Sequence, residues 1–325
     1  MCQLPQKTKF LVVSFICILT LVGCTNSTVP KEPSVTSSSA VSSQAQSPVA
    51  DTPVKAAEAP VKTADTPVQF EEGVLSTNEK HEWAFAFTPE MDSMILQRGN
   101  NDGSGKSTLY ESHLSDGKWS EPVKSDLAPD TLGEDGDPFI SPDGKRLFFA
   151  TNRTEHGTKD DNDIWVSERE GEKWSAPRPL EGPINSTSQE WLPSVAANGN
   201  LYFESDRPGG AGRVDLYVSK WTNGVYSEPE RLPDTINTAG LDESPYIAPD
   251  ESYLMFVRGH RFFISYRVNN EWTEPKAIVL QGDTGNIKYS PYVTKDQSTL
   301  YYTSTWRGTA DIYKVSFNPS DYKPQ

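Results

Sequence analysis

The sequence predicts an all-β fold built from one repeated unit, and three observations lead to it. Short segments in which apolar and polar residues alternate follow one another from residue 80 to 317, with turns between them. The same order of segments recurs about every 50 residues. Turn formers are abundant, with 22 Gly and 25 Pro among 325 residues. Because one such unit cannot bury both of its faces alone, the units must pack against each other.

Five units align on the turn that follows their first strand, at Pro89, Pro142, Ala197, Pro249 and Lys295. A second strand follows each turn, and a third strand follows a loop, at 108–114, 163–169, 215–221, 262–268 and 311–317. In four units a Ser/Thr-x-Pro sequence then introduces a fourth strand. Four short antiparallel strands per period are typical of a β-propeller blade.

Two aromatic residues stand nine positions apart at the end of every unit. The first belongs to the third strand, and the second precedes the fourth. The pairs are Tyr110/Trp119, Trp165/Trp174, Tyr217/Tyr226, Phe263/Trp272 and Tyr313/Tyr322. Their recurrence favours a role in the core between blades over contact with a ligand.

The ring is expected to close with strands from both ends of the chain. The fifth unit lacks its fourth strand, whereas Pro67 lies 22 residues before Pro89, close to the 20-residue spacing of the other junctions. We therefore predict that a strand at 68–71 completes the blade formed by 291–317, which removes the exposed sheet edges. Five blades are favoured. Six are the alternative, but no stretch of about 45 residues remains for a sixth.

The first 23 residues have the features of an export signal. Lys7 and Lys9 precede an apolar run at 10–22, too short for a comfortable membrane span. The run ends in Leu21-Val22-Gly23-Cys24, which resembles the bacterial lipobox. The resemblance implies a signal peptide at 1–23 and a lipid-modified Cys24. An uncleaved anchor and an ordinary secretory signal are the alternatives.

Residues 24–65 are expected to form a disordered tether, and residues 66–325 the propeller domain. The tether is rich in Ser, Thr, Ala, Pro and Val and has no aromatic residue. Cys2 and Cys17 lie in the predicted signal, so the mature chain has no disulfide and no Cys-based metal site. The formal net charge of −15 argues against nucleic-acid binding.

The repeats at 141–168 and 205–219 are similar to the WD-like repeats of TolB-type β-propellers. The residues that carry this resemblance are SPDGKRLFFATNR, DIWVSE and SDRPGGAGRVDLYVS. The resemblance implies the fold and a place in the bacterial cell envelope. It does not imply a function, because this class of repeat has many roles. The Thr25 that follows Cys24 favours the outer membrane, facing the periplasm, if the source is Gram-negative.

The first strand of a blade lines the central channel, and the residues that open it are the candidate ligand-binding residues. They are Glu82, Asp135, Glu190, Asp242 and Lys288, with Asp137 and Glu243 as further acids nearby. This set indicates a site for a cation or polar ligand, or the carboxylate pair of a glycan-active enzyme. The structural alternative is that these residues cap loops and solvate the channel.

Two other charge patterns are interpreted as structural. An Arg follows each second strand, at positions 98, 153, 207, 258 and 307, and is expected to pair with an Asp that opens the third strand, at 163, 215 or 311. The acidic segment 154–163 has oxygen ligands suited to Ca²⁺ but no EF-hand pattern, so a solvated loop is favoured.

The sequence therefore predicts a lipid-anchored, monomeric envelope propeller that acts as a binding or scaffold module for a protein or polysaccharide. A glycan-active hydrolase or lyase is the alternative. No catalytic residue, metal site or cofactor is assigned, because no nucleophile elbow, phosphate loop or dinucleotide fingerprint is present.

Overall fold

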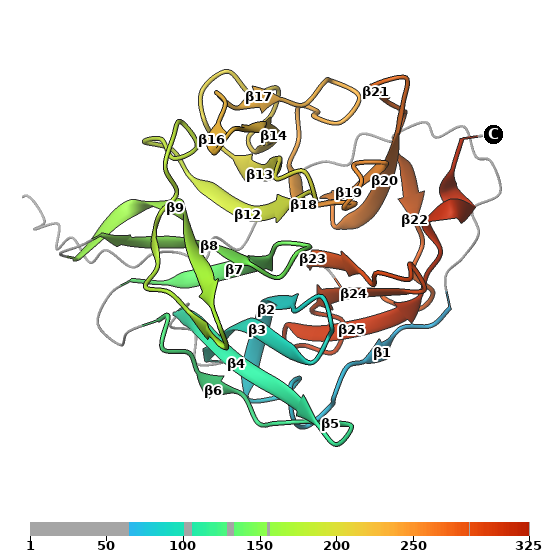
Figure 1. Ribbon diagram of the computed structural model, residues 1–325. Coiled ribbons are helices and arrows are strands. Elements are labelled where there is room, and N and C mark those ends of the chain that lie inside the picture. The colour runs from blue at the N-terminus through green and yellow to red at the C-terminus, as the bar shows by residue number, and fades with distance from the viewer. Residues whose placement is uncertain (1–64, 101–105, 129–132, 155–156, 286, 325) are drawn as a thin grey trace, which may run out of the picture. The chain divides into compact units, whose positions relative to one another are not determined.

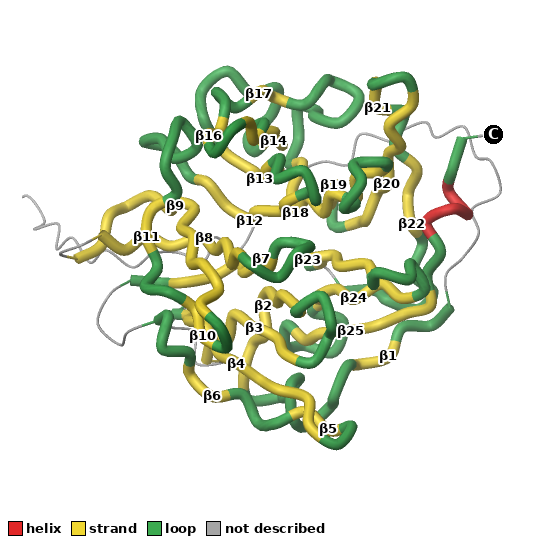
Figure 2. Tube along the Cα trace, in the orientation of Figure 1, coloured by secondary structure: helices red, strands yellow, loops and turns green. Residues whose placement is uncertain are grey.

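The computed structural model describes residues 65–100, 106–128, 133–154, 157–285 and 287–324. Within these ranges the protein is all-β, with one short 3₁₀ helix, η1 (Pro319–Tyr322), as the exception (Figure 2). The predicted signal peptide, Cys24 and the tether up to residue 64 lie outside the described residues. No described helix is both long and apolar enough to span a membrane.

Five antiparallel sheets of four main strands form the five predicted blades. Blade 1 contains β2 (Lys80–Phe87), β3 (Ser93–Asn100), β4 (Ser107–Ser115) and β6 (Val123–Lys124). Blade 2 contains β7 (Asp135–Ile140), β8 (Arg146–Thr154), β9 (Gly157–Glu170) and β11 (Arg178–Pro179). Blade 3 contains β12 (Glu190–Val195), β13 (Leu201–Ser205), β14 (Asp215–Ser219) and β17 (Glu230–Arg231).

Blade 4 contains β18 (Asp242–Ile247), β19 (Tyr253–Arg258), β20 (Arg261–Val268) and β22 (Lys276–Ile278). Blade 5 contains β23 (Lys288–Val293), β24 (Thr299–Ser304), β25 (Asp311–Ser316) and β1 (Val68–Gln69). Small hairpin strands before the fourth strand of blades 1 to 4 are β5 (Lys118–Trp119), β10 (Lys173–Trp174), β15 (Trp221–Thr222), β16 (Val225–Tyr226) and β21 (Glu271–Trp272).

The innermost strands close a ring, because each of β2, β7, β12, β18 and β23 contacts the next and β23 contacts β2 (Figure 1). The predicted seam is confirmed. Strand β1 pairs antiparallel with β25, with Val68 opposite Lys314 and Gln69 opposite Tyr313. The ladder continues one residue further, since the Phe70 N–H donates to the Ile312 carbonyl over 2.7 Å. Five blades, not six, are therefore present.

Five apolar clusters lie between consecutive blades, one at each interface. All ten of the repeated aromatic residues belong to these clusters or pack against them, so their predicted role in the core is confirmed. Burial of these faces is the main stabilising contribution of a blade stack.

The Ser/Thr-x-Pro sequence holds the turn before each fourth strand. In blade 1 the buried Ser112 hydroxyl donates to the Ser120 carbonyl over 2.7 Å, and the His113 N–H donates back to the Ser120 hydroxyl over 3.2 Å. Blades 2, 3 and 4 repeat both contacts at Ser175, Ser227 and Thr273. The motif is thus explained by local hydrogen bonding.

Of the acidic segment, residues 157–163 belong to strand β9 rather than to the predicted loop. It pairs back on β8, with Arg153 opposite Thr158 and Thr154 opposite Gly157, so β8 and β9 form a longer hairpin. Within it, the Lys159 ammonium lies 3.0 Å from an Asp161 oxygen and 2.6 Å from an Asp163 oxygen. A lysine thus supplies the positive charge that these acids need.

Candidate functional site

Four of the five predicted channel residues open their inner strand as expected, and Glu82 is the third residue of β2. All five are buried. We call Glu82, Asp135, Glu190, Asp242 and Lys288 the opening ring. Their burial makes partners necessary, because an unpaired buried charge is costly.

The four acids of the opening ring pair with the Arg of their own blade. The shortest nitrogen–oxygen distances are 2.7 Å for Arg98–Glu82, 3.1 Å for Arg153–Asp135, 3.0 Å for Arg207–Glu190 and 2.6 Å for Arg258–Asp242. The predicted pairing of these arginines with the Asp residues of the third strand is corrected accordingly. The second strand lies between the first and third, and the acid of the first strand supplies the contact.

The same acids also hold the chain segment that enters each inner strand. The Thr238 N–H donates to Asp242 over 2.6 Å, and the Ser186 N–H donates to Glu190 over 3.0 Å. The Arg258 guanidinium donates in turn to the Ile236 carbonyl over 2.6 Å. Acid and arginine together thus fasten the connection between two blades.

In blade 5 the inner strand opens with a cation, and its acidic partner lies in the segment before that strand. The Lys288 ammonium lies 3.3 Å from an Asp283 oxygen and donates to the Gly285 carbonyl over 2.6 Å. Asp283 also accepts from the Tyr302 hydroxyl over 2.8 Å. The opening ring therefore makes structural contacts in every blade. The ligand role that the sequence predicts for it stays a prediction.

All five inner strands have a bulge or irregularity just inside the opening ring, and in blades 2 to 5 it contains a residue with positive φ. Asp137, Leu192, Ser244 and Ser290 have positive φ values of 52°, 46°, 53° and 50°, and each precedes a proline. The strand register shifts there, as it does between Gly136 and Phe139. Positive φ is strained for residues other than glycine, and such strain concentrates at functional positions.

Side chains of the preceding blade bind the bulge N–H groups. The Asp137 N–H donates to Gln97 Oε1 over 3.1 Å, and the Ser244 N–H donates to Glu204 Oε2 over 2.7 Å. The Leu192 N–H donates to the Asp137 carboxyl. The bulges thus link one blade to the next near the axis.

These contacts gather one polar side chain from each blade. We call Gln97, Asp137, Glu204, Glu243 and Tyr289 the channel cluster. Burial raises the pKa of Asp137 to about 6 and that of Glu243 to about 7, and for Glu243 the adjacent Asp242 carboxylate adds to the shift. Burial, with Glu243 and Asp137 nearby, raises the pKa of Glu204 well above its usual range.

The sequence pointed to Asp137 and Glu243 as acids near the channel, but it gave no signal for Glu204. The strand register places Glu204 at the position of Gln97, Ala150, Val257 and Thr303 in the other blades. Because no residue type is shared there, repeat alignment cannot single the position out.

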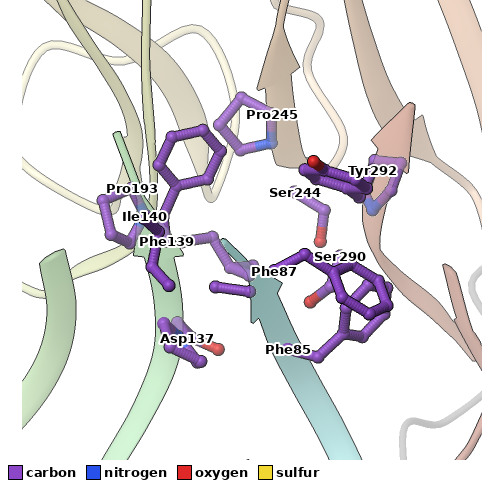
Figure 3. A pocket seen from close by; sticks show the side chains of 14 residues that line it. Phe85, Phe87, Asp137, Phe139, Ile140, Pro193, Ser244, Pro245, Ser290 and Tyr292 are labelled. Carbon is purple, nitrogen blue, oxygen red and sulfur yellow. The ribbon is translucent and has the colours of Figure 1, made fainter. Parts of the chain in front are cut away.

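A narrow cavity of about 30 Å³ lies beside the cluster and is lined by all five inner strands. Figure 3 shows the Asp137 carboxyl and the Ser244 and Ser290 hydroxyls directed into it, with Phe87 and Phe139 on its walls. This volume suits one or two water molecules. No group of three or more His, Cys, Asp or Glu residues in the described chain is arranged to hold a metal ion.

Comparison with known proteins confirms the fold. No protein-family model and no curated protein matches the chain. The α-L-arabinofuranosidase from Lactobacillus brevis superposes with a TM-score of 0.53 at 11% identity, over 75% of this chain and 93% of that one.

TolB proteins are also among the similar structures. TolB from Acinetobacter baumannii gives a TM-score of 0.42 at 16% identity, over 72% of this chain and 55% of that one, so the match spans about half of that protein. The putative TolB from Agrobacterium tumefaciens gives 0.44 at 18%, over 70% and 71%. At these identities the likeness concerns the propeller fold alone.

Proposed function

We propose that this protein is a binding module of the cell envelope, anchored through a lipid on Cys24, that holds a protein or polysaccharide partner without transforming it. The observation that carries the proposal is that the four acids of the opening ring already have partners within the protein. Glu82, Asp135, Glu190 and Asp242 are buried and paired with arginine. A monomer without cofactor fits this role.

The size of the cavity among the inner strands supports binding over catalysis. A glycosidase needs two carboxylates that flank a sugar, separated by roughly 5 to 10 Å. The cavity among the inner strands has about 30 Å³, which is too small for a sugar ring. Contact with a partner is therefore assigned to the outer surfaces of the ring.

The second candidate, a glycan-active hydrolase or lyase, is supported by the channel cluster. Glu243 and Asp137 have raised pKa values near neutrality, as catalytic acids often do. In this reading Glu243 and Asp137 are the acid and base.

A combined binding and turnover assay separates the two. The protein is incubated with neutral and acidic polysaccharides, and retention in affinity electrophoresis is measured together with release of reducing ends and unsaturated products. We expect retention without product. Product formation that disappears in Glu243→Gln and Asp137→Asn variants would establish the enzyme instead.

The anchor is tested separately by fractionation. The Cys24→Ala variant should move from the membrane fraction to the soluble envelope fraction, because the lipid is lost with the thiol. Continued membrane association of a folded Cys24→Ala protein would contradict the lipid anchor.

A further inference from the structure

The grooves between blades offer an internal comparison, because equivalent residues line them. The groove between blades 3 and 4 has a volume of about 530 Å³, whereas the equivalent groove between blades 1 and 2 has about 30 Å³. Figure 1 shows the strands of blades 3 and 4 next to each other. Packing alone would give equivalent grooves similar volumes, so the larger of these two grooves is a candidate binding site. Its volume falls within the usual range for ligand pockets.

Both grooves have a tryptophan and an arginine at the same repeat positions. They are Trp272 and Arg267 in the large groove and Trp174 and Arg169 in the small one. The arginine lies over the tryptophan ring in each, at 5.8 Å and 5.0 Å from its centroid. The difference between the grooves therefore comes from other lining residues.

The facing wall is polar in the large groove. Asn200 and Tyr202 stand there at the positions that Ser93 and Ile95 occupy in blade 1. On the blade that holds Trp272, Glu251 replaces Gly144 of the equivalent turn and adopts a φ of 56°, where Gly144 has 71°. This backbone conformation is unfavourable for a residue with a Cβ atom.

Four donors hold the Glu251 carboxylate. They are Asn198 Nδ2 at 2.8 Å, Asn200 Nδ2 at 2.9 Å, the Tyr202 hydroxyl at 2.7 Å and Arg267 Nη1 at 3.4 Å. These hydrogen bonds lower the pKa of Glu251 against the effect of burial, so it stays ionised at neutral pH. They also fix the side chains of Asn200, Tyr202 and Arg267 along the groove.

The charges of the groove balance. Its lining contains three cationic residues, Lys220, Arg231 and Arg267, and three acidic ones, Glu230, Glu251 and Glu271. Lys220 pairs with Glu230 at 2.9 Å, and Arg231 pairs with Asp234 at 2.5 Å. A lining without net charge does not select a strongly anionic or cationic ligand.

We propose that this groove binds a short segment of a neutral polysaccharide. The half-buried Trp272, which also packs against the core between blades 3 and 4, supplies apolar surface in the groove for the C–H side of a sugar ring. The amide and charged groups supply donors and acceptors for the sugar hydroxyls. The inference rests on the proposed binding function and gives that function its ligand class.

The test is a titration with cellohexaose, xylohexaose, maltohexaose and chitohexaose, with hexagalacturonate as the anionic comparison. Binding is followed by calorimetry and by tryptophan fluorescence. We expect one neutral hexasaccharide to bind. Trp272→Ala should weaken it at least tenfold, and Trp174→Ala, at the same position of the small groove, should leave the affinity within twofold.

Trp272→Phe keeps an apolar ring in the core and guards against misfolding, and thermal melting checks all three variants. We expect Trp272→Phe to weaken binding by a few-fold with an unchanged melting curve. A neutral sugar that binds equally well to folded Trp272→Ala overturns the groove site and leaves the binding function standing. Tight binding of hexagalacturonate or of a peptide in this groove overturns the ligand class. Failure of every saccharide overturns the site and removes the polysaccharide branch of the proposed function.

Discussion

Single buried charges hold the connections between blades. Asp242 shows the arrangement, because its carboxylate is fully buried and meets both the Arg258 guanidinium and the Thr238 backbone N–H. Removing one partner of such a pair leaves the other uncompensated, which costs far more than the loss of an exposed pair.

Asp242→Ala is therefore expected to lower the free energy of unfolding by about 3–5 kcal/mol. Glu168→Ala is the matched control, because the Arg178–Glu168 pair has about half of each side chain exposed, at 49% and 58%. That change should cost under about 1 kcal/mol. Urea unfolding measures both. Equal losses would show that Asp242 does not hold the blade connection.

At the scale of elements, the two-residue strand β1 depends on packing more than on its ladder. Phe70, which follows it, is 4% exposed and lies edge-on to Tyr301 at 5.1 Å. It also meets Phe87 of blade 1 at 6.0 Å. One side chain thus joins blade 5 to blade 1.

Phe70→Ala should cost about 3–5 kcal/mol, as expected for a buried Phe. Val68→Ala, in the same strand, should change the stability by less than about 0.5 kcal/mol because Val68 is 53% exposed. The comparison is made by chemical denaturation. Similar small effects for both would mean that the seam contributes little to stability.

At the scale of the whole molecule, the channel cluster makes stability depend on pH. Asp137, Glu204 and Glu243 have pKa values above those of the unfolded chain, so the folded state holds their protons more tightly. Their stabilising contribution is complete below about pH 4 and is lost as the pH rises through about 6 to 7 and beyond. Glu251, with a lowered pKa, acts in the opposite sense in acid.

The free energy of unfolding should therefore be higher at pH 5 than at pH 8, by on the order of 2 kcal/mol. In Glu204→Gln, blade 3 has the same residue type as blade 1 has at the equivalent position, Gln97. This variant should show a smaller difference in the free energy of unfolding between pH 5 and pH 8. Urea titrations of both proteins at the two pH values provide the measurement. A stability that rises toward pH 8 would contradict the raised pKa values of these three carboxyls.

The repeat explains why the fold was predictable. Each blade has the same packing. The repeated aromatic pairs and the position of Pro67, 22 residues before Pro89, were therefore enough to predict five blades and the seam. The partners of the arginines were not predictable, because a second strand has a neighbour on either side and periodicity does not choose between them. Glu204 and Glu251 gave no signal since each departs from its repeat, and their contacts come from neighbouring blades. The strand at 157–163 was not predicted either, because its residues are polar and charged and show no apolar alternation.

The seam also sets an order for folding. Val68 precedes its partner Lys314 by 246 residues, so β1 reaches the compartment in which the protein folds well before the strand that it completes. Blades 1 to 4 can form in that interval, whereas blade 5 needs both ends of the chain. The ring therefore closes last. Another segment that paired with the edge of β25 before β1 did would leave an otherwise folded propeller open.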